Sequence, residues 1–285
     1  MKVILFGAYG WLGSFFSNIL NDFDINFIKT NIRADNYNDV ELLINQVKPT
    51  HLISFIGRTH GQNINSIDYL QSNDKLKDNL NDNLFAPIVL AEMARKYNLH
   101  FTYIGTGCIF DNDTTYDNHY IYNENDSPDY FGSNYSIVKG FTDKYMKLNS
   151  SVLNLRIRMP ISNKHSPRNF ITKIINYNNI CSIPNSMTVI DTLFPYIIDM
   201  MKNNITGTFN FVNPGIISHN EILELYKTHI DPSLTWNNIT IEEQNNILQS
   251  KRSNNHLDSN KLLSLYPDIP NIKDAITNTI INMKL

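Results

Sequence analysis

Three glycines near the start of the chain, Gly7, Gly10 and Gly13, most constrain how this sequence can fold. They follow an apolar run at residues 3–6 that has strand character, and they precede an amphipathic stretch that extends to Leu20. Glycines in this position permit a tight strand-to-helix turn, close approach of the backbone to a pyrophosphate, and close packing of helix against strand. The sequence therefore predicts a dinucleotide site, although its G-x-x-G-x-x-G spacing differs from the G-x-G-x-x-G of many dehydrogenases.

Strand-like and helix-like stretches alternate along the first half of the chain. Apolar runs at 25–28, 51–55, 100–104 and 152–157 are separated by helix candidates at 40–47, 84–97 and 135–147. This order predicts an α/β fold: a Rossmann-like, doubly wound parallel sheet with helices on both faces. Beyond Pro160 the pattern loosens, with a further strand expected at 207–211 and a helix expected after the capping box Ser218 to Glu221.

We therefore expect two parts. Residues 1–160, completed by 187–212, should form the dinucleotide-binding domain. Residues 161–186 and 213–285 should form a smaller, irregular lobe that binds the substrate.

Composition excludes several classes of protein. The net charge is −3 and the basic residues are scattered, so we expect no nucleic-acid partner. No apolar run approaches the ~18 residues of a membrane span, and the first run is too short for a signal peptide. Two cysteines, Cys108 and Cys181, form no disulfide framework, which favours a reducing cytoplasm. We assign no metal site.

The end of the second predicted strand bears on the choice of cofactor. NAD sites usually place a carboxylate there for the ribose 2′-OH. Residues 26–29 end without a carboxylate, and Lys29, Asn31 and Arg33 follow. A basic neighbourhood suits a 2′-phosphate, so we expect NADPH, with Arg33 among its contacts. The alternative is that Lys29 and Arg33 are solvated surface charges.

Tyr135 and Lys139 are four residues apart, so they share one face of the predicted helix. A lysine ammonium there is expected to lower the pKa of Tyr135 from about 10 toward neutrality and make it a usable proton donor. A Y-x-x-x-K pattern alone is common and often marks a surface pair. It becomes specific in combination with the glycine turn and with Thr106, which ends a predicted strand some thirty residues earlier.

This combination resembles the extended short-chain dehydrogenase/reductases that act on nucleotide sugars. The stretches "GTGCIF", "GSNYSIVKG", "RMPIS", "PRNFITKI", "IPNSMTVID" and "KRSNNHLDSNKL" resemble, more narrowly, the bifunctional UDP-4-keto-6-deoxyglucose 3,5-epimerase/4-reductases that make UDP-L-rhamnose in plants and giant viruses. The resemblance is weakest at 26–75, where "FIGRTHG" replaces an alanine-rich turn. The frequent Asn and Ile suit a viral source, in which case the location is the host cytoplasm.

The resemblance implies roles for particular residues. Thr106, Tyr135 and Lys139 would serve reduction, and Cys108 would exchange protons beside the sugar ring. Without the resemblance, Cys108 reads more naturally as a small core residue. The second epimerisation residue would be Lys173, with His165 as the alternative and a surface role for Lys173 left open. The expected cofactor contacts are Gly7, Tyr9, Gly10, Trp11, Leu12, Gly13, Arg33, Ile56, Gly57, Arg58, Tyr135, Lys139 and Arg158. The expected substrate contacts are Asn83, Asn169, Arg252 and Asn255; Asn254 and Asn255 could equally shape the following turn.

Three functions compete at this point. The leading one is the bifunctional epimerase/reductase, a homodimer by resemblance. The second is a 4-keto-sugar reductase without epimerase action, or an enzyme for GDP- or dTDP-sugars, since the residues do not reveal the base. The third is a non-catalytic NADP-binding regulatory subunit, against which the intact Thr106, Tyr135 and Lys139 set argues.

Overall fold

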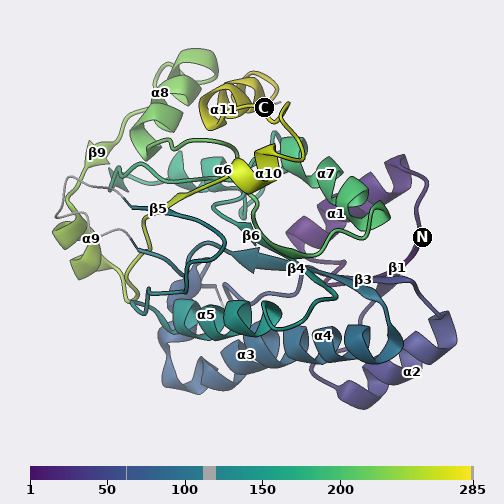
Figure 1. Cartoon of the computed structure of the whole chain (residues 1–285). Helices are drawn as coiled ribbons and strands as arrows, with labels where there is room; N and C mark the ends of the chain where they lie inside the picture. Colours follow the sequence, from purple (N-terminus) through teal and green to yellow (C-terminus); the bar gives the residue numbers. More distant parts are fainter. Residues whose placement is uncertain (62, 112–119, 284–285) are drawn as a thin grey trace.

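The computed structural model of the chain describes residues 1–61, 63–111 and 120–283, which build a parallel sheet between two helical layers (Figure 1). The strand order is β2 (Asn26–Thr30), β1 (Lys2–Phe6), β3 (His51–Ser54), β4 (His100–Thr106), β6 (Val152–Ile157) and β8 (Gly207–Asn210). Neighbouring strands in this sheet are parallel. The strand order reverses at β1 and β3, which confirms the predicted doubly wound α/β fold.

Alternate residues of β1 enter two different cores. Val3 and Leu5 lie in one apolar cluster, and Ile4 and Phe6 lie in another, because successive side chains of a strand point to opposite faces. The first cluster includes residues of α1 (Trp11–Asp22) and α7 (Ile190–Lys202); the second includes residues of α2 (Tyr37–Val47), α4 (Ala86–Tyr97) and α5 (Asn134–Met146). Both faces of the sheet are thus covered.

The helix expected at 84–97 starts earlier than predicted. A continuous helical run begins with α3 (Leu76–Leu80), passes through a π-helical turn, η3 (Asn81–Phe85), and becomes α4. Pro87 has no N–H to give the Asn83 carbonyl four residues earlier. The Thr142 hydroxyl on α5 donates to that carbonyl instead, at 2.6 Å. The π-helical turn brings Asp82 and Asn83 toward the carboxyl end of β3, where they contact Arg58.

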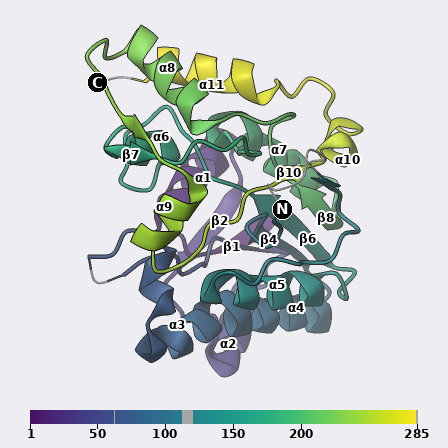
Figure 2. The same cartoon turned by 90° about the vertical axis from the view of Figure 1, so that its left-hand side faces the viewer.

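The rest of the chain forms short elements beyond the sheet (Figure 2). Ile171, Ile222 and Ile276 belong to a third apolar cluster, shared by α6 (Phe170–Ile174), α8 (His219–His229) and α11 (Ile272–Ile281). The predicted capping box of Ser218 and Glu221 is present at the start of α8. The helix α10 (Asn260–Leu263) was expected to belong to the smaller lobe. Its Leu262 instead packs in the first apolar cluster, which covers one face of the sheet. The remaining elements are α9 (Ile241–Ile247), β5 (Ile121–Tyr122) paired with β10 (His256–Leu257), and β7 (Asn179–Ile180) paired with β9 (Asn237–Asn238).

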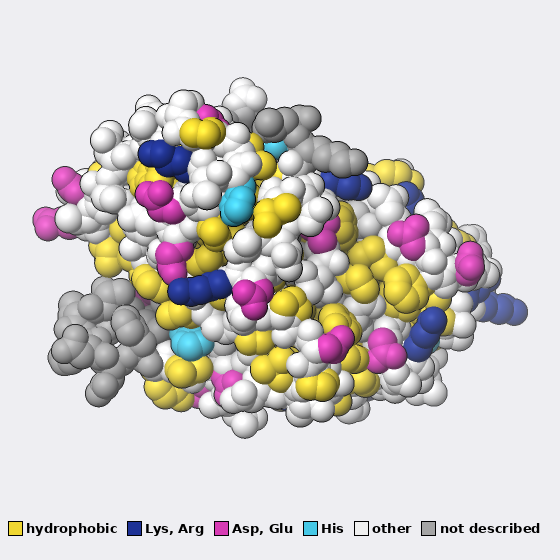
Figure 3. Space-filling view, turned by 90° about the horizontal axis from the view of Figure 1, so that it is seen from above, with side chains coloured by type: hydrophobic (Ala, Val, Ile, Leu, Met, Phe, Trp, Pro, Cys, Tyr) yellow, Lys and Arg dark blue, Asp and Glu magenta, His cyan; other side chains and the backbone are white. Residues whose placement is uncertain are grey.

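The surface carries mixed charge. On the face seen in Figure 3, basic and acidic side chains are interspersed and form no continuous basic patch. Within the described ranges, no helix combines the length and the apolar character needed to cross a bilayer.

Two buried histidines lie next to each other at the amino ends of β3 and β4. The rings of His51 and His100 are 5.1 Å apart, and their Nε2 atoms lie 3.0 Å and 2.8 Å from the carbonyls of Met201 and Ile205. Burial lowers the pKa of His51 to about 4 and also lowers the pKa of His100. Both rings are therefore neutral in the folded protein at pH 7.

We expect this pair to make folding stability fall on mild acidification. The unfolded chain, with a histidine pKa near 6.5, binds more protons than the folded chain between pH 6.5 and 4, so the free energy of unfolding decreases as pH falls. For His51 alone the loss from pH 7 to pH 5 should be about 2 kcal/mol. Urea denaturation at both pH values measures it. His51→Gln should reduce the loss and exposed His165→Gln should not; an unchanged loss in His51→Gln would refute this assignment.

Candidate active site

The glycine turn has the backbone geometry that its sequence predicts. Gly7 has φ +70°, and a Cβ there would lie 2.8 Å from the Phe55 backbone carbon. A Cβ on Gly13 would lie 2.1 Å from the Gly7 carbonyl oxygen. Gly10 caps α1 without any side chain of its own, so the first N–H groups of the helix face the carboxyl ends of the strands.

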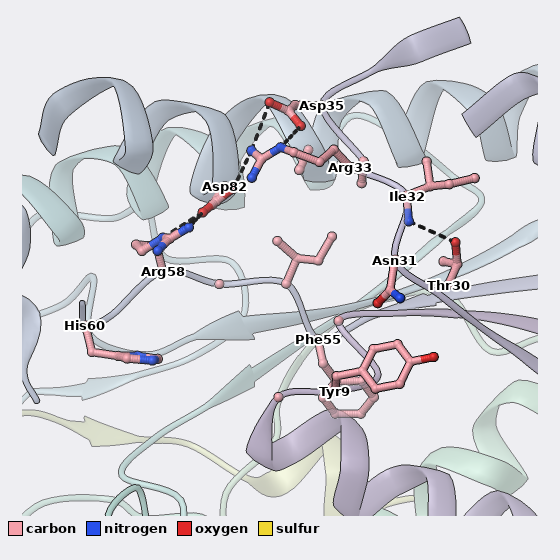
Figure 4. A pocket seen from close by; sticks show the side chains of 16 residues that line it. Tyr9, Thr30, Asn31, Ile32, Arg33, Asp35, Phe55, Arg58, His60 and Asp82 are labelled. Atoms are coloured by element: carbon pink, nitrogen blue, oxygen red, sulfur yellow. Dashed lines mark hydrogen bonds and ion pairs between the residues drawn. The ribbon is translucent and has the colours of Figure 1, made fainter. Parts of the chain in front are cut away.

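A cavity of about 340 Å³ opens at this edge, where the strand order reverses (Figure 4). Open α/β sheets bind ligands at this kind of position. Seven of the residues expected to contact the cofactor line it: Gly7, Tyr9, Gly10, Arg33, Ile56, Gly57 and Arg58. Trp11 and Leu12 pack against the apolar cluster of the sheet, and Gly13 lies beneath the turn. Tyr135, Lys139 and Arg158, also expected to contact the cofactor, do not line this cavity.

Carboxylates enter the cavity, contrary to the expectation of a purely basic site. Arg33 donates to Asp35 from Nε at 2.9 Å and to Asp82 from Nη2 at 2.8 Å. Arg58 donates to Asp82 from Nε at 2.7 Å. Lys29 is exposed and lies outside the cavity lining. Asp35, two residues after Arg33, was not among the residues considered from the sequence.

These features fit a dinucleotide. The turn leaves no room for side chains at Gly7 and Gly13, so the backbone around the helix start is open to a pyrophosphate. Arg33, at the end of β2, can reach the adenosine ribose, the position that separates NADP from NAD. The donor set therefore suits a nicotinamide dinucleotide, which would supply or accept a hydride there.

Tyr135 and Lys139 are both buried on α5, one helical turn apart. Tyr135 is hydrogen-bonded to Thr106, at the end of β4. Burial, followed by the charge of Cys108, raises the pKa of Tyr135 and outweighs the effect of Thr106. The Lys139 ammonium donates to the hydroxyl of Tyr103 and not to Tyr135. The predicted lowering of the Tyr135 pKa by Lys139 is therefore wrong; Tyr135 is held protonated.

Lys139 itself is strongly perturbed. Burial lowers its pKa to about 7, against the opposing charges of Asp143 and Cys108. Its ammonium lies 4.5 Å from the centre of the Tyr103 ring. A lysine with this pKa exchanges protons readily at neutral pH, and its hydrogen-bond partner is Tyr103.

Cys108 lies beside this group. Its backbone N–H donates to the Thr106 hydroxyl at 3.1 Å, and its sulfur accepts from Nη1 of Arg158 at 3.7 Å. The side chain is partly exposed and packs against the cluster that contains Tyr135. Cys108 is therefore a partly exposed thiol beside a buried guanidinium and next to Thr106 and Tyr135. Arg158, expected at the cofactor, is fully buried next to this thiol.

Lys173 is half-buried on α6, and burial lowers its pKa to about 8, with Arg168 and Arg252 adding to the effect. Its Nζ donates to the carbonyl of Asn65 at 3.3 Å. His165, the alternative, is exposed. Lys173 therefore has a larger share of neutral amine near neutral pH than an ordinary lysine.

The sequence offered no context for His60, yet it lines the cavity at the end away from Thr30 and Asn31 (Figure 4). Burial, followed by the charges of Arg168, Arg58 and Lys173, lowers its pKa to about 4. Only the fold places this neutral imidazole near Lys173, because His60 follows β3 and Lys173 lies on α6, far apart in the sequence.

Arg252 is held by a carboxylate that sequence reasoning also missed. Its Nη2 lies 2.6 Å from Oδ2 of Asp68, and Asp68 also accepts from the backbone N–H of Ser250 at 2.8 Å. The ion pair ties the segment after β3 to the segment before β10.

The asparagines that were expected to contact the substrate are buried, and their side chains form hydrogen bonds within the protein. Asn83 bonds the backbone N–H and carbonyl of Arg58, both at 2.9 Å. Asn169 caps α6 and donates to the carbonyls of Ser162 and Lys164. Asn255 donates to the carbonyls of Gly107 and Phe110, both at 2.8 Å. These three side chains shape the walls of the site.

Comparison with known proteins places the chain. It is 50% identical, over its full length and 99% of the relative, to protein L780 of Acanthamoeba polyphaga mimivirus. The crystal structure of that protein, named a UDP-rhamnose synthase, superposes with a TM-score of 0.96 over 99% of each chain. An Arabidopsis thaliana bifunctional dTDP-4-dehydrorhamnose 3,5-epimerase/reductase is 37% identical over 96% of this chain and 90% of its own. The chain belongs to this epimerase/reductase family.

More distant relatives agree in fold. Trifunctional Arabidopsis UDP-rhamnose enzymes are 37% identical, and this chain spans 41% of their length. The dTDP-4-dehydrorhamnose reductase of Bacillus anthracis, solved in complex with NADP, is 17% identical and shares the fold with a TM-score of 0.83. No family model matches the chain.

Proposed function

We propose that this epimerase/reductase converts UDP-4-keto-6-deoxy-D-glucose to UDP-L-rhamnose by 3,5-epimerisation and NADPH-dependent 4-reduction. The observation that carries the proposal is the convergence of Thr106, Cys108, Tyr135 and Lys139 after β4, in a chain whose glycine turn also lines a cavity. Epimerisation and reduction both act on one 4-keto group, so one site with two sets of proton donors can serve both.

The epimerase half uses the acidity of the hydrogens next to the ketone. Loss of the C3 or C5 proton gives an enolate on the C4 oxygen, which the Thr106 hydroxyl can stabilise by a hydrogen bond. Cys108 takes or returns protons on one face of the ring, and Lys173, with its pKa of about 8, acts on the other. The Arg158 guanidinium donates to the Cys108 sulfur at 3.7 Å and so fixes the position of the thiol beside Thr106.

The reductase half needs an acid at the C4 oxygen. Tyr135 is protonated at neutral pH and hydrogen-bonded to Thr106, so it can donate its proton as hydride reaches C4. The buried Lys139, whose pKa is about 7, is hydrogen-bonded to Tyr103 and can carry a proton at neutral pH. The residues that follow β1 and β3 would hold a nicotinamide dinucleotide, which would supply the hydride when bound.

We assign the diphosphate of the substrate to Arg252. Its guanidinium is only partly exposed and is positioned by Asp68, and an arginine fork binds phosphate oxygens in pairs. We further propose that the reaction takes place in a reducing cytoplasm, which the two free thiols Cys108 and Cys181 support.

Incubation with NADPH and UDP-4-keto-6-deoxyglucose, followed by NMR identification of the sugar, tests the function. The expected product is UDP-L-rhamnose. Accumulation of a 4-reduced sugar with its original C3 and C5 configuration would contradict the epimerase half. A parallel reaction with the dTDP-sugar decides the base, since the Arabidopsis relative carries a dTDP-sugar name.

NADPH should bind more tightly than NADH. Arg33 and Arg58 line the cavity at the adenosine end and offer charge-assisted hydrogen bonds to a 2′-phosphate. Fluorescence titration measures the dissociation constants of both cofactors. We expect the constant for NADH to be at least about tenfold larger, the difference that one charge-assisted hydrogen bond makes. Equal dissociation constants would remove the argument for a 2′-phosphate site.

We also propose a homodimer formed through the face of α5 and η3. Phe141 on α5 and Phe85 on η3 are large apolar residues that are 60% and 49% exposed, and the two elements pack together. Exposed apolar clusters of this kind mark interfaces. A monomer mass in light scattering at micromolar concentration would contradict this assembly.

A further inference from the structure

One carboxylate in the cofactor cavity holds two arginines at once. Asp82 accepts from Arg33 through Oδ1 at 2.8 Å and from Arg58 through Oδ2 at 2.7 Å (Figure 4). The Asp82 side chain is 11% exposed, whereas the Arg33 side chain is 57% exposed. The carboxylate is therefore the fixed partner, and Arg33 is the one able to turn toward a ligand.

These groups meet only because three separate elements converge. Arg33 follows β2, Arg58 follows β3, and Asp82 is presented by the π-helical turn η3. Asp35 also belongs to this cluster, because it accepts a hydrogen bond from Nε of Arg33. Two arginines and two aspartates sum to zero formal charge, so the cluster offers hydrogen-bond donors without a net positive field.

A zero net charge matters for a dianion. A phosphate that approaches Arg33 gains charge-assisted bonds but is repelled by the two carboxylates, Asp82 and Asp35. Both oxygens of Asp82 already take the place that phosphate oxygens would take between two guanidinium groups. A phosphate that binds these guanidinium groups must therefore share them with Asp82.

We infer that Asp82 is a specificity-determining residue of the cofactor cavity: its carboxylate occupies Arg33 and Arg58 and competes with the 2′-phosphate of the dinucleotide for them. The inference rests on the proposed use of NADPH. Asp82 limits the preference for a 2′-phosphorylated cofactor, and its removal strengthens that preference.

Calorimetric titration with 2′,5′-ADP and 5′-AMP tests the inference without catalysis. Asp82→Asn keeps the size of the side chain and one acceptor but gives the cluster a charge of +1. It should bind 2′,5′-ADP about three- to tenfold more tightly than the wild type, as expected for removing one unit of like charge in a partly solvated site. Affinity for 5′-AMP should stay within about twofold. Asp74→Asn removes a surface carboxylate paired with Lys75 and serves as the matched control, with no change expected.

Unchanged or weaker binding of 2′,5′-ADP by Asp82→Asn would overturn the inference. Arg58→Met tests the same cluster if the first variant folds poorly; it should weaken 2′,5′-ADP binding and leave 5′-AMP binding unchanged, and no effect would also overturn the inference. A wild type that fails to prefer 2′,5′-ADP over 5′-AMP contradicts the proposed use of NADPH. If Asp82→Asn then prefers 2′,5′-ADP over 5′-AMP, the inferred role of Asp82 stands. If it shows no such preference, both the proposed use of NADPH and the inferred role of Asp82 fail.

Discussion

Tyr135→Phe should lower the rate of NADPH consumption about 10²- to 10⁴-fold, the usual contribution of a general acid. The phenol is buried, protonated at neutral pH and hydrogen-bonded to Thr106. Removing its hydroxyl leaves no acid in that position, because the Lys139 ammonium is bonded to Tyr103. Stopped-flow or steady-state absorbance of NADPH with the 4-keto sugar measures the loss.

The same variant should retain proton exchange at the sugar ring. Enolate formation needs the base and the hydrogen bond from Thr106, but no hydride. In heavy water without NADPH, Tyr135→Phe should incorporate deuterium at C3 at close to the wild-type rate. Normal NADPH oxidation by Tyr135→Phe would show that another group protonates the C4 oxygen, and the assignment of Tyr135 would be wrong.

The fold was largely predictable because its signals are local. The alternation of apolar runs and amphipathic stretches, and the glycines at 7, 10 and 13, report directly on β1, α1 and the turn between them. The early start of the helix before α4 was not predictable in this way. It depends on the Thr142 hydroxyl reaching the Asn83 carbonyl from another helix, 59 residues later in the chain.

In the candidate site, too, the features that depend on local spacing were predictable and those that depend on distant segments were not. Thr106 and Cys108 share a strand end, and Tyr135 and Lys139 share a helix face, so local spacing brings each pair together. The partners that set their chemistry come from distant segments: Arg158 beside Cys108 and Tyr103 beside Lys139. The expected effect of Lys139 on Tyr135 failed for this reason, since periodicity shows that two residues share a face but not which third group intervenes.

The net charge of the cavity shows most clearly what the sequence could not predict. Lys29 and Arg33 suggested a basic site, yet Asp35 and Asp82 neutralise it. Asp82 is 49 residues from Arg33 in sequence, and only the topology of the sheet brings them together.

Cys108→Ala should separate the two activities. The substitution removes the thiol but keeps Thr106, Tyr135 and Lys139 in place, so the ketone stays within reach of hydride. Wild-type enzyme in heavy water without NADPH should exchange the C3 hydrogen for deuterium, and Cys108→Ala should exchange it at least about 10²-fold more slowly. With NADPH, the variant should still reduce the ketone and give a sugar that retains its original C3 configuration.

The control variants define what a positive result means. His165→Gln changes an exposed residue and should leave deuterium uptake unchanged, whereas Lys173→Met should slow uptake because it removes the amine that burial holds near a pKa of 8. The wild-type rate of exchange should rise with pH toward 8 as the Lys173 amine deprotonates, and Lys173→Met should lose this rise. Deuterium uptake by Cys108→Ala at the wild-type rate would mean that the thiol only fills space beside Tyr135, and that the base for C3 must be sought among other residues of the cavity wall, with His60 the first to test.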